Sequence, residues 1–128
     1  MPINLGGCRF SEPVKLVKWK PPHSSGIYAL LIAGASTLTR FGYQVIYFGE
    51  AQDLSALRVD ERHPAYPCWL VIAGSVQDLY VSAFPTRGLT AAGRKALMSE
   101  LVAAARPFCN YETRRSPHQR PPQNPQRG

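Results

Sequence analysis

Two stretches of apolar residues dominate the first half of the chain, and each has the length of a strand. Ile27–Ala33 is a run of seven apolar residues between Gly26 and Gly34, which suits a buried strand better than a helix. Gln44–Ala51 contains a run of β-favouring residues, Val-Ile-Tyr-Phe. A polar, glycine-containing connection, residues 34–43, joins the two. The pattern predicts an antiparallel hairpin with a long tip.

Two later segments have the capping residues and the periodicity of helices. Asp53 is placed to cap a helix that runs to about Arg62. Thr90 precedes a second predicted helix, which ends at about Ala105 because Pro107 follows. The apolar residues of this second helix recur on one helical face: Leu97, Met98, Leu101, Val102 and Ala105.

Short strands are predicted at Trp69–Ala73 and Leu79–Ala83, joined by a turn at residues 74–78. The elements then follow in the order β-β-α-β-β-α. This order predicts an α+β fold, a small antiparallel β-sheet with two covering helices. Residues 1–25 are punctuated by prolines and glycines, so we expect them to be irregular apart from a short strand within Val14–Trp19.

The end of the chain differs in composition from residues 26–110, which we expect to form one domain. Residues 111–128 hold four prolines and four arginines, one acidic residue and no aliphatic residue. Such a segment has too little to bury, so it is predicted to be a disordered basic tail. The whole chain has 15 Lys and Arg against 8 Asp and Glu, a net charge of +7 that favours a polyanionic partner. A tail that only solubilises the chain is the alternative.

The three cysteines, Cys8, Cys68 and Cys109, are widely spaced and include no CxxC pair. This spacing argues against a zinc site and against a disulfide framework, so we expect buried free thiols in a reducing compartment. The longest apolar run has seven residues, whereas a membrane-spanning helix needs about 20. The sequence therefore predicts a cytoplasmic protein with no membrane partner.

Short motifs in the predicted domain resemble those of the GIY-YIG nuclease family. The two hairpin strands contain Gly26-Ile27-Tyr28 and Tyr47-Phe48-Gly49, and Glu-Ala-Gln-Asp-Leu follows the second. The end of the last helix, with Pro107-Phe108-Cys109-Asn110 after it, is similar to the closing motif of the family. The stretch from His63 to Trp69 is similar to one branch of it. The resemblance covers residues 26–110 and implies a GIY-YIG-like fold.

The resemblance implies hydrolysis of DNA phosphodiester bonds with Mg²⁺ or Mn²⁺ as cofactor. Tyr28 and Tyr47 would lie beside the attacking water, and strand alternation places Tyr28 with Leu30, and Tyr47 with Val45 and Gly49, so both phenols would share one sheet face. The alternative is that β-propensity alone places tyrosines in strands.

Three further residues are candidates for the same site. The family arginine falls on Leu57, so Arg58, one residue later, is the candidate that stabilises charge on the phosphate. His63 would be a base or a phosphate ligand, or simply a histidine favoured at a helix C-terminus. Asn110 matches a position expected to bind substrate, although asparagine is also common in turns.

The metal-binding glutamate of the family has no match. Its position is occupied by Met98, and Glu100 lies about 200° around the helix from there, so it is a poor candidate metal ligand. Glu50 and Asp53 are the other acidic residues near the motifs, and Asp53 is better explained as a helix cap.

Three functions therefore stay open. The chain is a GIY-YIG-like nuclease, a catalytically degenerate domain that binds nucleic acid, or a protein-interaction module on the same scaffold.

Overall fold

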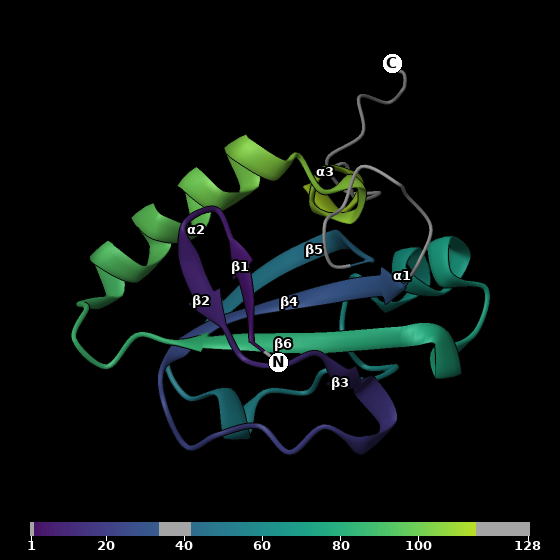
Figure 1. Ribbon diagram of the computed structural model, residues 1–128, viewed down its shortest axis with the longest axis horizontal. Helices are drawn as coiled ribbons and strands as arrows, with labels where there is room; N and C mark the ends of the chain where they lie inside the picture. The colour runs from purple at the N-terminus through teal and green to yellow at the C-terminus, as the bar shows by residue number, and fades with distance from the viewer. Residues whose placement is uncertain (1, 34–41, 115–128) are drawn as a thin grey trace.

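The computed structural model describes residues 2–33 and 42–114, which form a small α+β fold with two antiparallel sheets (Figure 1). The main sheet has four strands in the order β3-β6-β4-β5. Its strands are β3 (Val14–Lys15), β4 (Gly26–Ala33), β5 (Tyr43–Ala51) and β6 (Leu79–Pro85). Two short strands, β1 (Ile3–Leu5) and β2 (Cys8–Phe10), make a separate hairpin.

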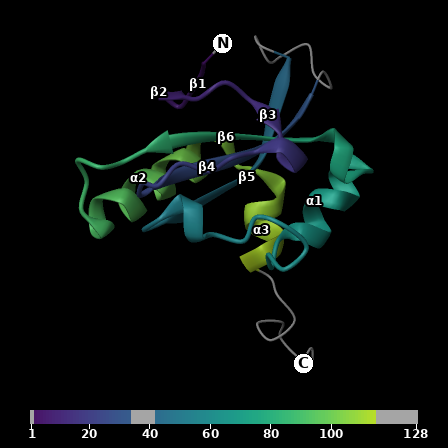
Figure 2. The same cartoon turned by 90° about the horizontal axis from the view of Figure 1, so that it is seen from below.

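The described residues include three α-helices: α1 (Tyr66–Ala73) lies between β5 and β6 in the chain, and α2 (Ala91–Ala105) and α3 (Phe108–Arg114) follow β6. Single 3-10 turns occur at Leu16–Lys18, Leu54–Ala56 and Val76–Asp78. Figure 2 shows the β1–β2 hairpin on one side of the main sheet and α1 and α3 on the other.

The central strand β4 is buried on both faces, and its side chains alternate between two cores. Tyr28 and Leu30 pack with Trp69 of α1 and Cys109 of α3. On the other face, the buried apolar residues come from β4, β5, the N-terminal hairpin and α2: Ile3, Phe10, Ile27, Ala29, Leu31, Phe48, Leu101 and Val102. The period-2 alternation of a strand thus gives each core its own set of side chains.

The predicted hairpin is confirmed, since β4 and β5 pair antiparallel. The register places Tyr28 opposite Gly49 and Leu30 opposite Tyr47, so both tyrosines face the same core as expected. A bulge after Leu30 shifts the register, and it moves Val45 to the opposite face. The expectation that Val45 shares a face with Tyr47 is therefore wrong. The hairpin tip, residues 34–41, lies outside the described residues.

The second predicted helix is also confirmed as α2, with the Thr90 hydroxyl accepting a hydrogen bond from the Gly93 amide. Pro107 follows it, as predicted, but α3 begins directly afterwards and reaches Arg114. The predicted tail therefore begins with helical residues, and its remainder, residues 115–128, lies outside the part of the chain that the structure describes.

The first predicted helix is wrong beyond its first turn. Asp53 caps it as expected, because its carboxylate accepts from the Ser55 amide, but only a 3-10 turn forms. The Asp60 carboxylate then accepts from the Arg62 amide, which makes a local turn. Leu54 is buried and Leu57 and Val59 pack against the same core, so these apolar residues are held on the sheet by turns and side-chain bonds and not by a helix.

Trp69–Ala73 is the second wrong assignment, since these residues form most of helix α1 and not a strand. Pro67 lies in the first turn of this helix, and Gly74, with φ of 85°, ends it. Proline is favoured in the first turn of a helix, and glycine is favoured directly after its last residue. The short strand expected within Val14–Trp19 is present as β3, and residues 1–25 contain more regular structure than expected because β1 and β2 also lie within them.

The cysteine prediction is wrong for two residues. Cys68 of α1 and Cys109 of α3 form a disulfide with a Cα–Cα distance of 5.8 Å, and Cys8 is free. The two cysteines are 41 positions apart, so their spacing gave no indication of the bond. Disulfides are rare in reducing compartments, so the cysteines no longer support a cytoplasmic location. The location stays a prediction.

Candidate functional site

Tyr28, Tyr47 and His63 form a hydrogen-bonded cluster on one face of the main sheet. The hydroxyl of Tyr28 lies 2.8 Å from His63 Nε2, and it is also hydrogen-bonded to the hydroxyl of Tyr47. The rings of Tyr28 and Tyr47 are 6.1 Å apart, and that of His63 lies 5.4 Å from Tyr47. The structure therefore brings together three of the residues that the sequence proposed as catalytic.

Gly49 makes room for this arrangement. It lies opposite Tyr28 in the β4–β5 register, and a Cβ atom at this position would overlap Cζ and the hydroxyl of Tyr28. The ring of Tyr28 thus crosses the strand where no side chain stands in its way. This close approach is a physical reason for the glycine of the Tyr47-Phe48-Gly49 motif.

The backbone fixes the proton of His63. The amide of Ala65 donates to His63 Nδ1 at 3.0 Å, so Nδ1 carries a lone pair. A neutral imidazole then has its proton on Nε2, which donates to the hydroxyl of Tyr28. Tyr28 donates in turn to Tyr47, whose pKa this bond lowers. The chain of bonds runs from His63 through Tyr28 to Tyr47 and leaves Tyr47 as the last donor.

Burial keeps all three groups neutral. It raises the pKa of Tyr28 far above its usual value, and the neighbouring Tyr47 adds to the shift. Burial also raises the pKa of Tyr47 and lowers that of His63, although the charge of Asp60 acts against the shift of His63. Desolvation disfavours the charged form of each group, so the resting cluster is a set of neutral hydrogen-bonding partners.

Trp69 closes the cluster from the side of α1. Its ring lies 4.6 Å from that of His63 and 5.4 Å from that of Tyr47, and the residue is fully buried. Its Nε1–H makes no hydrogen bond within the described residues. The indole thus acts as an apolar wall that keeps solvent from His63.

Tyr47 also reaches a cavity outside the buried cluster. This cavity has a volume of about 310 Å³ and lies between β5, α2 and α3. Its lining residues are Tyr47, Met98, Ser99, Val102, Ala103, Asn110 and Tyr111. Met98 therefore borders the same space as Tyr47, as the motif alignment expected. We call this cavity the Tyr47 pocket.

Asn110 borders the Tyr47 pocket, but the oxygen and the nitrogen of its side-chain amide both form hydrogen bonds with the backbone of Phe48. Its Oδ1 accepts from the Phe48 amide and its Nδ2 donates to the Phe48 carbonyl, each at 2.8 Å. The side chain thereby caps the outer edge of β5, the last strand of the sheet in the part of the chain that the structure describes. The residue predicted to bind substrate thus holds α3 against the sheet, and its predicted role in binding stays a prediction.

Arg58 is not brought to the cluster. It is exposed, it follows the 3-10 turn at Leu54–Ala56, and no described contact joins it to Tyr28, Tyr47 or His63. The helix on which the motif alignment placed it does not form.

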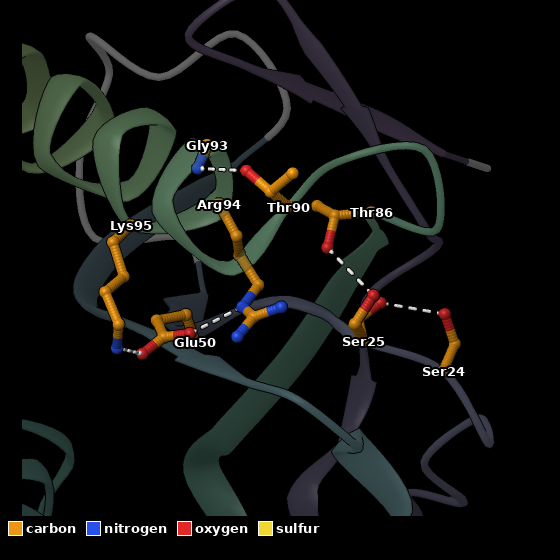
Figure 3. A network of polar contacts seen from close by, with 8 residues as sticks. All are labelled: Ser24, Ser25, Glu50, Thr86, Thr90, Gly93, Arg94 and Lys95. Carbon is orange, nitrogen blue, oxygen red and sulfur yellow. Dashed lines mark hydrogen bonds and ion pairs between the residues drawn. The ribbon is translucent and has the colours of Figure 1, made fainter.

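The acidic candidates are engaged elsewhere. Glu50 accepts from Arg94 Nε at 2.6 Å and from Lys95 Nζ at 2.7 Å, as Figure 3 shows. Burial of Glu50 raises its pKa, but the bonds from Lys95 and Arg94 outweigh this and hold the pKa below its usual value. Glu100 is exposed on α2 and its charge acts on Cys8 of the N-terminal hairpin, whose pKa is raised mainly by burial.

A hard divalent cation does not fit the donors of the Tyr47 pocket. The pocket offers the Tyr47 and Ser99 hydroxyls, the Met98 thioether and an amide that Phe48 occupies. Mg²⁺ and Mn²⁺ prefer carboxylate oxygens, and a thioether is a soft ligand. Within residues 2–33 and 42–114, no three His, Cys, Asp or Glu side chains are grouped as metal ligands would be.

Sequence reasoning missed several residues that build the site. Arg94 is nearly buried and holds Glu50, and its place in the first turn of α2, after Thr90, gave no hint of this partner. Cys68 and Cys109 join the helices on either side of the cluster. Gly49 is the exception, since the sequence drew attention to it as part of the Tyr47-Phe48-Gly49 motif.

Comparison with protein-family models, with curated proteins and with solved structures found no match to this chain. Among the described residues, no helix has the length and apolar character needed to cross a membrane. The residues and the geometry of the cluster are therefore the basis from which a function is inferred.

Proposed function

We propose that the chain is a GIY-YIG-like domain that binds the phosphodiester backbone of nucleic acid at Tyr47. The observation that carries the proposal is the bonded cluster of Tyr28, Tyr47 and His63. The cluster joins Tyr28 and Tyr47, which come from the two motif strands, to His63, which begins the stretch from His63 to Trp69. These residues lie far apart in the sequence, and their hydrogen bonding goes beyond what β-propensity explains.

The direction of the hydrogen bonds suits an anionic ligand. Because His63 donates to Tyr28 and Tyr28 to Tyr47, the Tyr47 proton is left to donate outwards. A phosphate oxygen is an acceptor without protons at neutral pH, and a bond to a charged acceptor is stronger than one to a neutral acceptor. The net charge of +7 adds a sequence-independent attraction for the phosphate backbone.

Binding without cutting is the form of the function that the pocket supports. Metal-dependent hydrolysis requires a carboxylate beside the reacting phosphate, and the position that would supply it is Met98. The nuclease and the protein-interaction module remain the two competing functions, and each gives a different result in the experiment below.

The experiment is a fluorescence anisotropy titration with labelled single-stranded and duplex DNA and RNA over a salt series. Wild-type protein is compared with Tyr47→Phe, which loses the terminal donor together with the acceptor of the Tyr28 proton, and with Tyr80→Phe as the control. Tyr80 lies on the opposite face of the same sheet, where it packs on Tyr43 at 5.3 Å. We expect Tyr47→Phe to weaken binding about tenfold, the effect of one charge-assisted hydrogen bond, and Tyr80→Phe to leave it unchanged.

Three results would contradict the proposal. No binding at low salt would favour the protein-interaction module. Equal affinity of wild type and Tyr47→Phe would remove Tyr47 from the interface. Nicking of a plasmid by the wild-type protein with Mg²⁺ or Mn²⁺, lost in Tyr47→Phe, would make the protein a nuclease.

A further inference from the structure

The disulfide joins the two helices that border the candidate site. Cys68 precedes Trp69, the wall beside His63, and Cys109 precedes Asn110, the clamp on Phe48. The bond therefore connects α1, on the buried side of the cluster, with α3, which forms one wall of the Tyr47 pocket. Among the described residues, this disulfide is the one covalent cross-link, apart from the chain itself, that attaches α3 to the rest of the fold.

Helix α3 depends on such attachments. It has seven residues, and isolated helices of fewer than about 12 residues are marginal in water. Its other described anchors include the Asn110–Phe48 pair, the packing of Tyr111 against the second core, and the guanidinium of Arg106, which lies 5.3 Å from the ring centroid of Tyr111. Arg106 itself has a positive φ of 50°, an unfavourable backbone conformation for a residue with a side chain.

We propose that Cys68–Cys109 is a thiol-reversible modification site whose redox state controls the position of α3 and thereby the shape of the Tyr47 pocket. The co-reactant is a thiol, either a dithiol protein or a glutathione-type thiol. The proposal does not rest on nucleic-acid binding, because it concerns only the attachment of α3.

Exposure decides which sulfur is attacked. Cys109 is fully buried, whereas Cys68 is partly exposed. A thiolate from the reductant therefore attacks Sγ of Cys68, the Sγ–Sγ bond breaks, and Cys109 leaves with the electron pair and takes up a proton. A second thiolate from the reductant then attacks the mixed disulfide and releases Cys68. The protein gains two electrons and two protons, and the reductant becomes a disulfide.

Burial of the leaving sulfur couples this chemistry to movement of α3. A thiolate at Cys109 would form in the core beside Tyr28 and Trp69, where charge is disfavoured. Opening of α3 exposes that sulfur to water and makes it a better leaving group. Reduction therefore proceeds through the opened helix, and the reduced protein has lost the bond that closes it again.

The Phe48 amide reports the position of α3 directly. Its proton points away from β4 to the edge of the sheet, where it is donated to Asn110 Oδ1. Hydrogen exchange at this amide, followed by NMR, therefore measures whether the Asn110 clamp is closed. Amides of the central strand β4 serve as internal controls, because β5 and β6 flank them on both sides.

The experiment compares the full chain, oxidised and then reduced with dithiothreitol, and mass spectrometry verifies the redox state. We expect exchange at Phe48 to rise by about tenfold or more on reduction, while the β4 amides stay protected. The double variant Cys68→Ser/Cys109→Ser should resemble the reduced wild type and ignore dithiothreitol. Cys8→Ser removes the free thiol alone and should respond as the wild type does.

The proposal is overturned by any of three results. Two free thiols at positions 68 and 109 after oxidation would show that the bond does not form. Equal exchange at Phe48 in both redox states would show that α3 is held without it. Loss of protection throughout β4 on reduction would make the disulfide a staple of the whole fold and not a control of α3. The reduced wild type gives these answers even if the double variant fails to fold.

Discussion

The hydroxyl of Tyr28 and Nε2 of His63 lie 2.8 Å apart, although the residues are 35 positions apart in the chain. This bond links the central strand β4 to the irregular segment before α1. It also orients the one histidine of the cluster, whose other nitrogen accepts from the Ala65 amide. One imidazole thus forms hydrogen bonds with two buried groups, the Tyr28 hydroxyl and the Ala65 amide, so its protonation state affects both the site and the fold.

Lowering the pH should destabilise the protein through His63. Burial lowers the pKa of folded His63 below the usual 6.5, so the unfolded state takes up a proton first as the pH falls. Stability is therefore full above the unfolded pKa and is lost as the pH falls below it, by at most about 1.4 kcal/mol per pH unit for one proton. The measurement is urea unfolding at a series of pH values.

The contribution of His63 is isolated with two variants. His63→Gln should be less stable near neutral pH by about 1–3 kcal/mol, since Tyr28 loses a buried partner, and should show a shallower decline with acid. His23→Gln is the control, because His23 is exposed and lies outside the cluster. A wild-type decline that His63→Gln leaves unchanged would assign the acid sensitivity to other groups.

Gly49→Ala should displace the ring of Tyr28. A Cβ atom at Gly49 overlaps the phenol, whose neighbours in the core leave it little room to shift. Overpacking of this kind costs about 1–3 kcal/mol. Gly88→Ala is the matched control, because a Cβ there meets no atom within 4 Å. Thermal unfolding that is equally affected by both substitutions would contradict the close approach of Tyr28 to Gly49.

The sequence predicted what depends on local pattern. Apolar runs and capping residues located β4, β5 and α2, and strand alternation placed Tyr28 and Tyr47 on one face. The run Trp69–Ala73 was assigned wrongly because a short apolar segment has no periodicity that separates a buried helix from a buried strand.

Contacts between distant segments escaped prediction. The family resemblance grouped His63 with Tyr28 in one site but did not indicate the hydrogen bond between them, which spans 35 positions. No repeat or spacing in the sequence connects Cys68 to Cys109, 41 residues away. The same holds for the Asn110 clamp, since its partner is the backbone of Phe48 and not a recognisable side chain. The bulge after Leu30 likewise depends on the pairing between two strands, so the sequence did not show that Val45 lies on the opposite face from Tyr47.

Deletion of residues 115–128 should reduce the salt dependence of nucleic-acid binding. This segment contains three arginines and no acidic residue, so its removal takes away three positive charges. Each phosphate neutralised contributes about −0.9 to the slope of log K against log salt on duplex DNA, so the slope should flatten by up to about 2.7. The deleted segment begins after α3, so Tyr111 remains in the Tyr47 pocket. An unchanged slope would show that the tail does not contact the phosphate backbone.

The last prediction concerns the residue at the position of the family's metal ligand. Met98 borders the Tyr47 pocket with a thioether, which offers nothing to a hard cation, so Mg²⁺ or Mn²⁺ should leave the melting temperature of the wild type unchanged. Met98→Glu places a carboxylate in a half-buried wall. Without metal this variant should be less stable than the wild type, because an unpaired carboxylate is poorly solvated there.

Metal should then stabilise Met98→Glu by about 2.7 kcal/mol when its concentration is a hundred times the dissociation constant. Ala96→Glu is the matched control, since it adds the same charge to the exposed face of α2 outside the pocket. A folded Met98→Glu variant that ignores metal would mean that this chain differs from a metal-binding site at more than one residue. A wild type that metal stabilises, with the effect lost in Glu100→Gln, would restore Glu100 as the ligand and require a different helix register against the family motif.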